Sequence, residues 1–175
     1  MPDNDVLICG KIPNKGLDER TLELMGAGRK LSSDLGIGLS AVVIGDDLDP
    51  AAEELATFGV DRVYKLEHPL FETFKADLWV EALEKLCNQI KPKVLLVPHS
   101  ILYMEIAPRL AYRLGTTLTT DCIGLEIDQE DGLLLRTRPV YGGNAIAVFK
   151  YEGDPQFVTI REKAMEPAEP ISRKC

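Results

Sequence analysis

Short apolar runs alternate along much of the chain with longer segments whose apolar residues recur at helical spacing. The runs have the length and composition of strands buried on both faces, and they lie at residues 6–9, 41–44, 63–66 and 94–97. Helical spacing follows each run, at residues 18–35, 50–57, 71–90 and 101–114. This alternation predicts an α/β fold in which right-handed crossovers build a parallel sheet with helices on both faces.

The first predicted helix has capping residues at both ends and two glycines inside. Asp18 is suited to the N-cap and Gly36 to a left-handed C-cap. Gly26 and Gly28 each lower helix propensity by up to about 1 kcal/mol. We therefore expect this helix to lie close against the sheet.

The helix after the fourth strand has a proline within it. Ser100 is placed to be its N-cap, and Gly115 is placed to end it. Pro108 removes one amide from the helix. Either the helix is kinked at Pro108, or its regular part begins near Ile106.

The pattern changes after Thr119. Four strand-like runs are separated by turn-forming residues, and they cover residues 122–127, 133–137, 145–149 and 156–160. We expect them to extend the parallel sheet as an antiparallel, hairpin-rich end. Residues 165–175 have the composition of a linker or tail, so we predict one domain over residues 1–164.

Composition excludes several classes of protein. With 45% hydrophobic and 27% charged residues, the chain is typical of a globular domain, and its net charge of −8 argues against nucleic acid as a partner. No apolar run approaches the roughly 20 residues of a membrane span, and the first residues are acidic where a secretory signal is basic. We expect a cytoplasmic protein. The four scattered cysteines contain no metal-ligand spacing, so we predict no metal site.

The carboxyl end of the parallel sheet is the first candidate site. Open α/β sheets bind ligands in a crevice beyond their strand ends, which here involves Gly10, Lys11, His99 and Ser100. His99 is either a ligand contact or an ordinary loop residue, and it lacks the second partner that acid–base catalysis needs. We therefore predict no catalytic residue, and AMP or another adenine nucleotide as the ligand of this crevice.

The predicted hairpin around residue 140 is the second candidate site. Tyr141, Gly142, Gly143 and Asn144 form its turn, and two glycines allow backbone angles that other residues avoid. Arg138 lies two residues from another arginine, at 136, so both point to the same face of a strand. They either hold a phosphate or an acidic partner surface, or pair with nearby acids.

Four segments together resemble the amino-terminal domain of the electron transfer flavoprotein alpha subunit. They are Ile106-Ala-Pro-Arg-Leu-Ala-Tyr-Arg-Leu-Gly115, Thr120-Asp-Cys-Ile-Gly-Leu-Glu-Ile-Asp128, Thr137-Arg-Pro-Val-Tyr-Gly-Gly-Asn144 and Val158-Thr-Ile-Arg161. The resemblance implies a Rossmann-like, three-layer fold of the adenine nucleotide alpha-hydrolase type with central strand order 3-2-1-4-5. It also implies a heterodimer with a beta-type subunit, in which FAD carries electrons from an acyl-CoA or other dehydrogenase.

The resemblance further implies that FAD is held mainly by a second alpha domain. No such domain follows Cys175, so we expect it on a separate polypeptide, or removed, or absent from a stand-alone relative. Two motifs also depart from the family. Tyr103-Met104-Glu105 stands where the family usually has Gly-Arg-Asp, and Arg161-Glu-Lys where it tends to have Arg-Pro-Gly. The first change removes a glycine, which permits close backbone approach, and an arginine fork.

Two functions are consistent with these observations. The first is a non-enzymatic scaffold domain of an electron transfer flavoprotein-like complex, with the hairpin of Arg138 and Tyr141 to Asn144 facing the partner or the cofactor. The complex, rather than this chain alone, would hold FAD. The second is a stand-alone adenine-nucleotide-binding module that uses the crevice.

Overall fold

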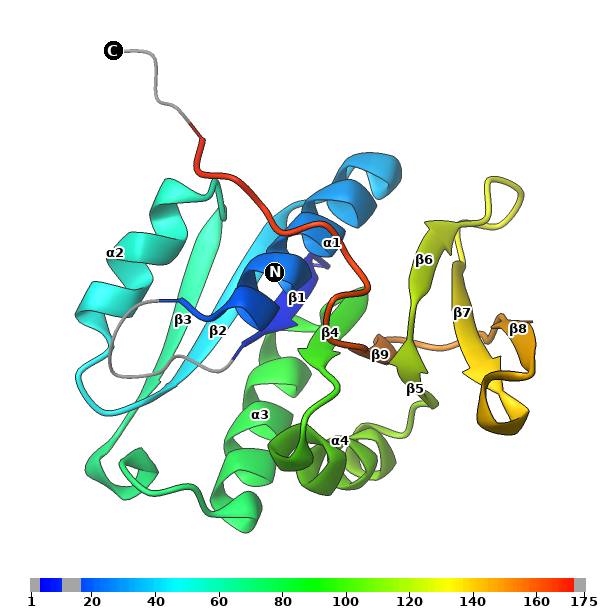
Figure 1. Ribbon diagram of the computed structural model, residues 1–175. Helices are drawn as coiled ribbons and strands as arrows, with labels where there is room; N and C mark the ends of the chain where they lie inside the picture. The colour runs from blue at the N-terminus through cyan, green and yellow to red at the C-terminus, as the bar shows by residue number, and fades with distance from the viewer. Residues whose placement is uncertain (1–3, 11–16, 172–175) are drawn as a thin grey trace.

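A six-stranded parallel sheet lies between two layers of helices in the computed structural model, which describes residues 4–10 and 17–171. The strand order is β3-β2-β1-β4-β9-β5, with bounds β1 Val6–Cys9, β2 Leu39–Gly45, β3 Arg62–Glu67, β4 Val94–Pro98, β5 Leu118–Cys122 and β9 Gln156–Ile160. The helices are α1 Glu19–Leu35, α2 Asp49–Thr57, α3 Ala76–Ile90 and α4 Ile101–Leu114. Helices α1 and α2 cover one face, and α3 and α4 cover the other (Figure 1). The predicted fold class is confirmed.

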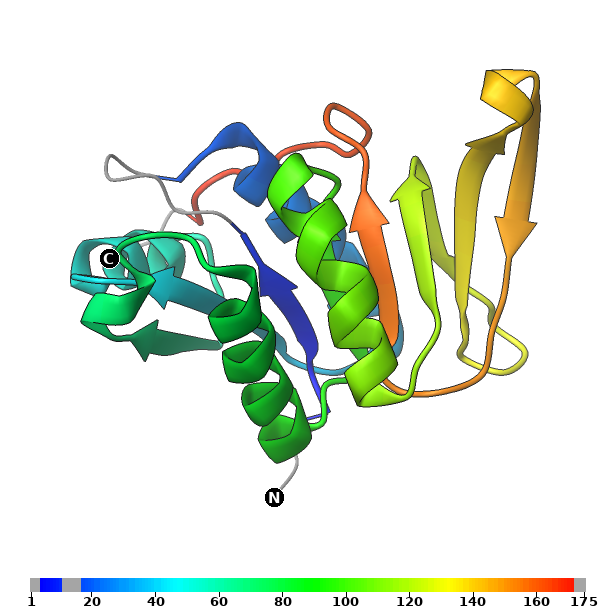
Figure 2. The same cartoon turned by 90° about the horizontal axis from the view of Figure 1, so that it is seen from below.

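Successive side chains of β1 point to opposite faces of the sheet, and each face has its own hydrophobic core. Val6 and Ile8 pack under α1, whereas Leu7 and Cys9 point to the side of α3 and α4, and all four are 0 to 1% exposed. A strand that is apolar at every position can bury both faces only in the middle of such a sheet. Figure 2 looks onto the α3 and α4 side, with the blue strand β1 visible between the two green helices.

The predicted caps of α1 are confirmed. The amide of Thr21 donates to Asp18 Oδ1 at 2.9 Å, and Gly36 ends the helix at φ 65°. Gly28 lies directly on the sheet, since a Cβ there would be 2.7 Å from Leu39 Cδ1. Gly26 faces elsewhere, because its Cβ would be 2.0 Å from the carbonyl oxygen of Glu166 in the C-terminal segment.

Helix α4 runs without interruption through Pro108. It begins at Ile101, so the alternative in which its regular part starts near Ile106 is wrong. Pro108 lies on the exposed side, where a carbonyl deprived of its amide partner can be hydrated. Helix α3 begins at Ala76, later than predicted, because Phe71 belongs to a separate turn, η1 Pro69–Phe71.

The C-terminal strands differ in arrangement from the prediction. The run 122–127 is divided between β5 and β6 Gly124–Ile127, and β6 starts an antiparallel sheet with β7 Leu134–Val140 and β8 Ala145–Phe149. Strand β9, predicted within the antiparallel end, is parallel and lies between β4 and β5. Its five residues are all buried, and only an interior strand has both faces covered. In Figures 1 and 2, β8 is the outermost strand of the small sheet.

Residues 165–171 follow the surface of α1 to α2, as the red segment in Figure 1 shows. The amide of Ala168 donates to Leu22 O at 2.8 Å, and the amide of Ile171 donates to Thr57 O at 3.0 Å. Arg29 Nη2 donates to Glu169 O at 2.9 Å. The part of the predicted linker that the structure describes is therefore held by specific hydrogen bonds.

Three of the four cysteines, Cys9, Cys87 and Cys122, are buried free thiols, while Cys175 lies outside the described residues. Within residues 4–10 and 17–171, no three acidic, histidine or cysteine side chains gather as metal ligands. Across the same residues, no helix combines the length and apolar character needed to cross a membrane.

Candidate functional site

The turn between β7 and β8 holds Tyr141 out in solvent. Its backbone has positive φ at three successive residues, 51° at Tyr141, 64° at Gly142 and 93° at Gly143. Asn144 closes the turn, because its Nδ2 and its amide both donate to Tyr141 O, at 2.9 and 3.3 Å. A Cβ added to either glycine would meet no atom within 4 Å, so the glycines serve the backbone conformation and not close packing. The Tyr141 side chain is 84% exposed.

The small sheet has a buried inner face and an exposed outer face. The inner face carries Leu125, Ile127 and Leu134 into the α1 core. The register places the following residues together on the opposite side, which we call the outer face: Gly124, Glu126, Leu135, Thr137, Pro139, Ile146 and Val148. Ile146 and Val148, on β8, are 59% and 60% exposed. Tyr141, Ile146 and Val148 together present a mainly apolar surface next to the outer edge of β8, which pairs with no further strand among the described residues.

The two arginines of β7 share the inner face, as predicted. Arg136 is completely buried, its Nη1 is 3.4 Å from Thr119 Oγ1, and its guanidinium lies 5.4 Å from the centre of the Tyr151 ring. Burial lowers the pKa of Arg136. Arg138 Nη1 donates to Thr120 Oγ1 at 3.1 Å. Within the described chain neither arginine forms an ion pair, so pairing with nearby acids does not explain them.

A polar cluster joins the carboxyl ends of β4, β9 and β5. Arg161 binds both carboxylate oxygens of Asp121, with Nε at 2.8 Å and Nη2 at 2.6 Å. His99 Nδ1 is 2.9 Å from Thr159 Oγ1, and its Nε2 is 3.9 Å from Asp121 Oδ1. The amide of Asp121 also donates to Thr159 Oγ1 at 2.9 Å. His99 therefore has partners within the protein, and its contacts link three neighbouring strands.

Electrostatics in this cluster favour a charged carboxylate. Hydrogen bonds from Arg161 lower the pKa of Asp121, and the nearby charges of His99 and Arg138 act in the same direction. Asp121 has φ 63° and lies in the irregular step of the β5–β9 register. The contacts of this cluster therefore hold the irregular end of β5, from which the chain continues into β6. The Thr159 hydroxyl lies beside the His99 ring, but Thr159 is completely buried and its Oγ1 already accepts the Asp121 amide, so the cluster presents no accessible nucleophile.

Among the described residues, the end of β1 next to the predicted crevice is packed by side chains from both adjoining helices. Tyr103, from the first turn of α4, is 1% exposed, and its hydroxyl is 2.9 Å from Cys9 Sγ and 3.4 Å from Gly10 O. On the other side of β1, Thr21 of α1 lies so close that a Cβ on Gly10 would be 2.3 Å from its Oγ1. The side chain of Ser100 makes no capping bond. Lys11 lies outside the described residues.

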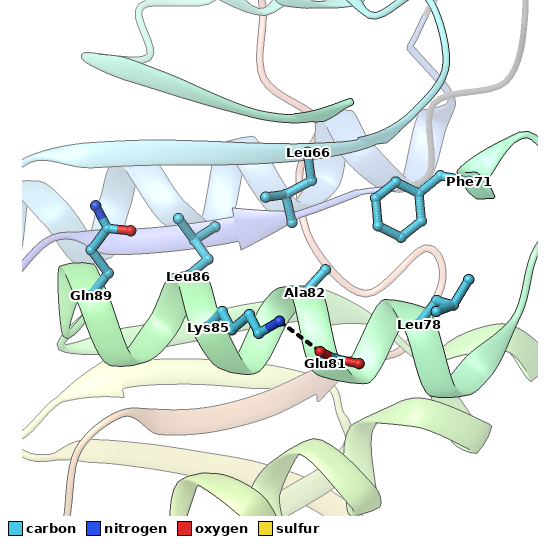
Figure 3. Close-up of a pocket in the computed structure, with 8 residues that line it drawn as sticks. All are labelled: Leu66, Phe71, Leu78, Glu81, Ala82, Lys85, Leu86 and Gln89. Atoms are coloured by element: carbon cyan, nitrogen blue, oxygen red, sulfur yellow. Dashed lines mark hydrogen bonds and ion pairs between the residues drawn. The ribbon is translucent and has the colours of Figure 1, made fainter. Parts of the chain in front are cut away.

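A shallow hollow of about 340 Å³ lies elsewhere, between β3 and α3 (Figure 3). Apolar side chains form most of its lining, including Leu66, Phe71 and Leu86. The Lys85 ammonium is paired with Glu81 at 2.6 Å along α3. None of the sequence-predicted site residues lines this hollow, and no group of convergent polar side chains makes it a catalytic site.

Sequence reasoning singled out His99 and missed its partners Asp121, Thr159 and Arg161 as site residues. In the sequence these three residues stood out only as members of the segments 120–128 and 158–161, and nothing there indicated that they lie near His99. Bringing them to His99 requires β9 to lie between β4 and β5, which the run of apolar residues does not reveal. The structure brings Arg138 near this cluster and leaves the turn of Tyr141 apart in solvent.

Comparison with known proteins shows one family over most of the chain. Residues 11–174 match the family model described as the electron transfer flavoprotein domain. The chain is 38% identical over 165 residues to the electron transfer flavoprotein subunit alpha of Thermoanaerobacterium thermosaccharolyticum, covering 94% of this chain and 50% of that protein. It is 35% identical over 151 residues to the subunit of the same name from Clostridium acetobutylicum, covering 86% and 45%.

A third relative carries a different name. The lactate dehydrogenase (NAD(+),ferredoxin) subunit LctC of Acetobacterium woodii is 34% identical over 153 residues, covering 87% of this chain and 36% of that protein. The chain therefore spans about half the length, or less, of these relatives.

Proposed function

The chain belongs to the electron transfer flavoprotein domain family, and from this premise we propose that it is the scaffold domain of an alpha-type subunit. Its role is to pair with a beta-type subunit and with a flavin-holding domain in a complex that transfers electrons from dehydrogenases. It is not itself an enzyme. The observation that carries this proposal is the apolar outer face of the small sheet, which has no covering element among the described residues.

The shape of the small sheet favours a protein partner at this place. Strand β8 pairs only with β7 in the described chain, so its other edge has backbone groups free for a partner. Ile146 and Val148 are β-branched residues two positions apart, and they point to the same side. An exposed edge strand with apolar side chains is an aggregation risk for a solitary domain, and burial in a stable interface removes that risk.

The proposed partner surface includes the turn. Tyr141 is well suited to an interface, because an aromatic side chain buries a large area for few rotatable bonds. Gly142 and Gly143 fix the direction in which it projects. Arg138 lies behind the turn, at the Asp121 cluster, and we assign it the support of this surface.

The flavin, in this proposal, is held mainly by another domain of the complex. FAD supplies the electron-carrying chemistry when it is bound. Tyr103 packs against Cys9 and Gly10 in the core at the end of β1, which gives no support to the alternative of an AMP-binding module. In this proposal, the chain provides the surface on which the beta-type subunit and the flavin-holding domain are positioned.

Co-expression with a tagged beta-type subunit from the same source tests the proposal. We expect the wild-type chain to co-purify in a 1:1 complex, and the double variant Ile146→Asp, Val148→Asp to lose at least about tenfold in affinity, since two buried charges oppose burial of the interface. Sedimentation velocity on the mixed proteins measures the affinity.

The matched control is Ile101→Asp on α4. Ile101 is 89% exposed and lies on another part of the surface, so we expect the control to bind like the wild type. Equal binding by the double variant and the wild type would exclude the outer face as the partner surface. Absence of any complex with the wild-type chain would overturn the proposed function itself.

A further inference from the structure

Helix α4 exposes large apolar side chains on its solvent side, and the other three helices do not. Ile101, Met104 and Tyr112 of α4 are 89%, 54% and 87% exposed. Helices α1, α2 and α3, which the structure describes over their whole length, expose no large apolar side chain. The opposite side of α4 is buried in the core through residues such as Ile106 and Leu110. A helix that is apolar on two opposite sides is expected to be covered on both.

The exposed apolar residues form one stripe along the full length of α4. With 3.6 residues per turn, positions 101, 104, 108 and 112 lie above one another on the same side of a helix. Pro108 is exposed as well. We call Ile101, Met104, Pro108 and Tyr112 the α4 stripe, and Figure 2 shows α4 at the surface of its helix layer. A stripe with this spacing is typical of a helix that packs against another helix.

Two opposite charges lie beside the α4 stripe, one turn apart. Glu105 is exposed and forms no ion pair among the described residues, whereas Arg109 is paired with Asp77 of α3. The Arg109 side chain is still 41% exposed, so part of its guanidinium faces solvent. Residues four positions apart lie on the same border of a helix. The border of the stripe therefore presents an acidic group followed by a basic one.

This order of groups is complementary to itself when two copies of α4 pack antiparallel. Ile101 would face Tyr112 of the second copy, and Glu105 would face Arg109 of the second copy. Both pairs are centred close to Ala107, so a single register satisfies them together. A two-fold axis produces every such contact twice. Parallel packing would instead place Glu105 against Glu105 and Arg109 against Arg109.

We propose that the α4 stripe is a self-association surface, on which a second copy of the chain docks through its own α4 in antiparallel orientation. Apolar contacts supply the attraction, and two ion pairs between Glu105 and Arg109 fix the register. The net charge of −8 disfavours an anionic membrane surface as the occupant. This inference does not depend on the proposed function, which concerns the small sheet.

The size of the contact indicates a weak dimer. Helix α4 has 14 residues and is about 21 Å long. One pair of such helices buries less than the roughly 1,600 Å² of a standard protein interface. We therefore expect a dissociation constant of about 10–100 µM, and a dimer that forms and dissociates with concentration.

Sedimentation equilibrium of the full chain between about 5 and 500 µM tests the proposal. The apparent mass of the wild type should rise from 19.4 kDa towards that of a dimer. Glu105→Arg should weaken association at least about tenfold, because both ion pairs become repulsions. The double variant Glu105→Arg, Arg109→Glu has the net charge of the wild type and restores both pairs. Its dissociation constant should return to within about threefold of the wild-type value.

The matched control is Glu53→Arg on α2. Glu53 is exposed, and α2 covers the opposite face of the sheet. The substitution changes the net charge as Glu105→Arg does, and a lower negative charge reduces repulsion between copies. Glu53→Arg should thus associate as well as the wild type or better. Melting temperatures of both variants within about 2 °C of the wild type would show that the fold is intact.

Ile101→Asp separates the α4 stripe from the surface for a beta-type subunit. It should lose self-association at least about tenfold while it keeps its affinity for that subunit. Loss of subunit binding with unchanged self-association would assign the stripe to the subunit and overturn the proposal. A wild-type chain that is monomeric at every concentration would also overturn it. So would equal effects of Glu53→Arg and Glu105→Arg, or a double variant that does not recover.

Discussion

Replacing Gly26 by alanine has two opposite effects on stability, a gain in helix propensity and a clash with the C-terminal segment. Replacing glycine by alanine inside a helix is worth about 1 kcal/mol of stability when nothing else changes. At Gly26, however, the added Cβ would be 2.0 Å from Glu166 O, a backbone atom that no side-chain rotation can move. The C-terminal segment would have to leave the surface of α1.

The interactions that hold this segment on α1 outweigh the gain in helix propensity. Detachment breaks the hydrogen bonds from Ala168 N to Leu22 O and from Arg29 to Glu169 O, at about 1 kcal/mol each. It also exposes the Ala168 methyl group, which is worth about another 0.8 kcal/mol. A loss of about 3 kcal/mol against a gain of about 1 predicts that Gly26→Ala is destabilised by about 2 kcal/mol.

Urea unfolding measures the stability, and hydrogen exchange at the Ala168 amide measures the attachment. The pair Lys30→Gly and Lys30→Ala gives the propensity difference at an exposed position of the same helix. We expect Ala168 to exchange much faster in Gly26→Ala than in wild type. A Gly26→Ala protein that gains the full propensity difference while Ala168 stays protected would refute the reasoning.

Three further predictions concern the other end of the sheet. Arg136→Met should be neutral or stabilising by up to about 2 kcal/mol in urea unfolding, because the guanidinium is buried, its Nε has no hydrogen-bond partner and it forms no ion pair in the described chain; a loss of stability would show that its charge is needed. Because the folded state lowers the pKa of Asp121, the carboxylate stabilises the protein at neutral pH and loses that contribution as the pH falls through the folded pKa. The stability difference between wild type and Asp121→Asn should therefore shrink below about pH 4, and a difference independent of pH would contradict the ion pair with Arg161. Gly143→Ala should cost about 1–2 kcal/mol in unfolding experiments from its φ of 93° alone, since its Cβ meets no atom; a neutral substitution would contradict this conformation.

Local sequence rules located most elements because they depend on neighbours in the chain. Asp18 and Gly36 form caps whose donors and acceptors lie within a few residues, so the ends of α1 were predictable. The hairpin turn was predictable for the same reason, since Gly142 and Gly143 indicate their own backbone angles. Candidate site residues followed from these elements, and His99 was found as a strand-end residue.

Other features depended on which strands lie side by side. The partners of His99 come from β9 and β5, and no local pattern places β9 between β4 and β5. Gly26 and Gly28 both appear in the sequence as glycines inside a helix, yet Gly28 contacts the sheet and Gly26 contacts residue 166. Tyr103 was noticed as a departure from the family, and only the structure showed that its hydroxyl contacts Cys9 and Gly10 in the core.

The sequence by itself determined the layered α/β class, both ends of α1, the hairpin turn and the resemblance to electron transfer flavoprotein alpha subunits. Tertiary structure decided the insertion of β9, the attachment of residues 165–171 and the packing of Tyr103 against Cys9 and Gly10. The physical reason is the distance along the chain over which the deciding interactions act. Caps, turns and periodicity are set by hydrogen bonds and dihedral angles within a few residues, whereas strand order and filled space result from burying surfaces that are distant in the chain.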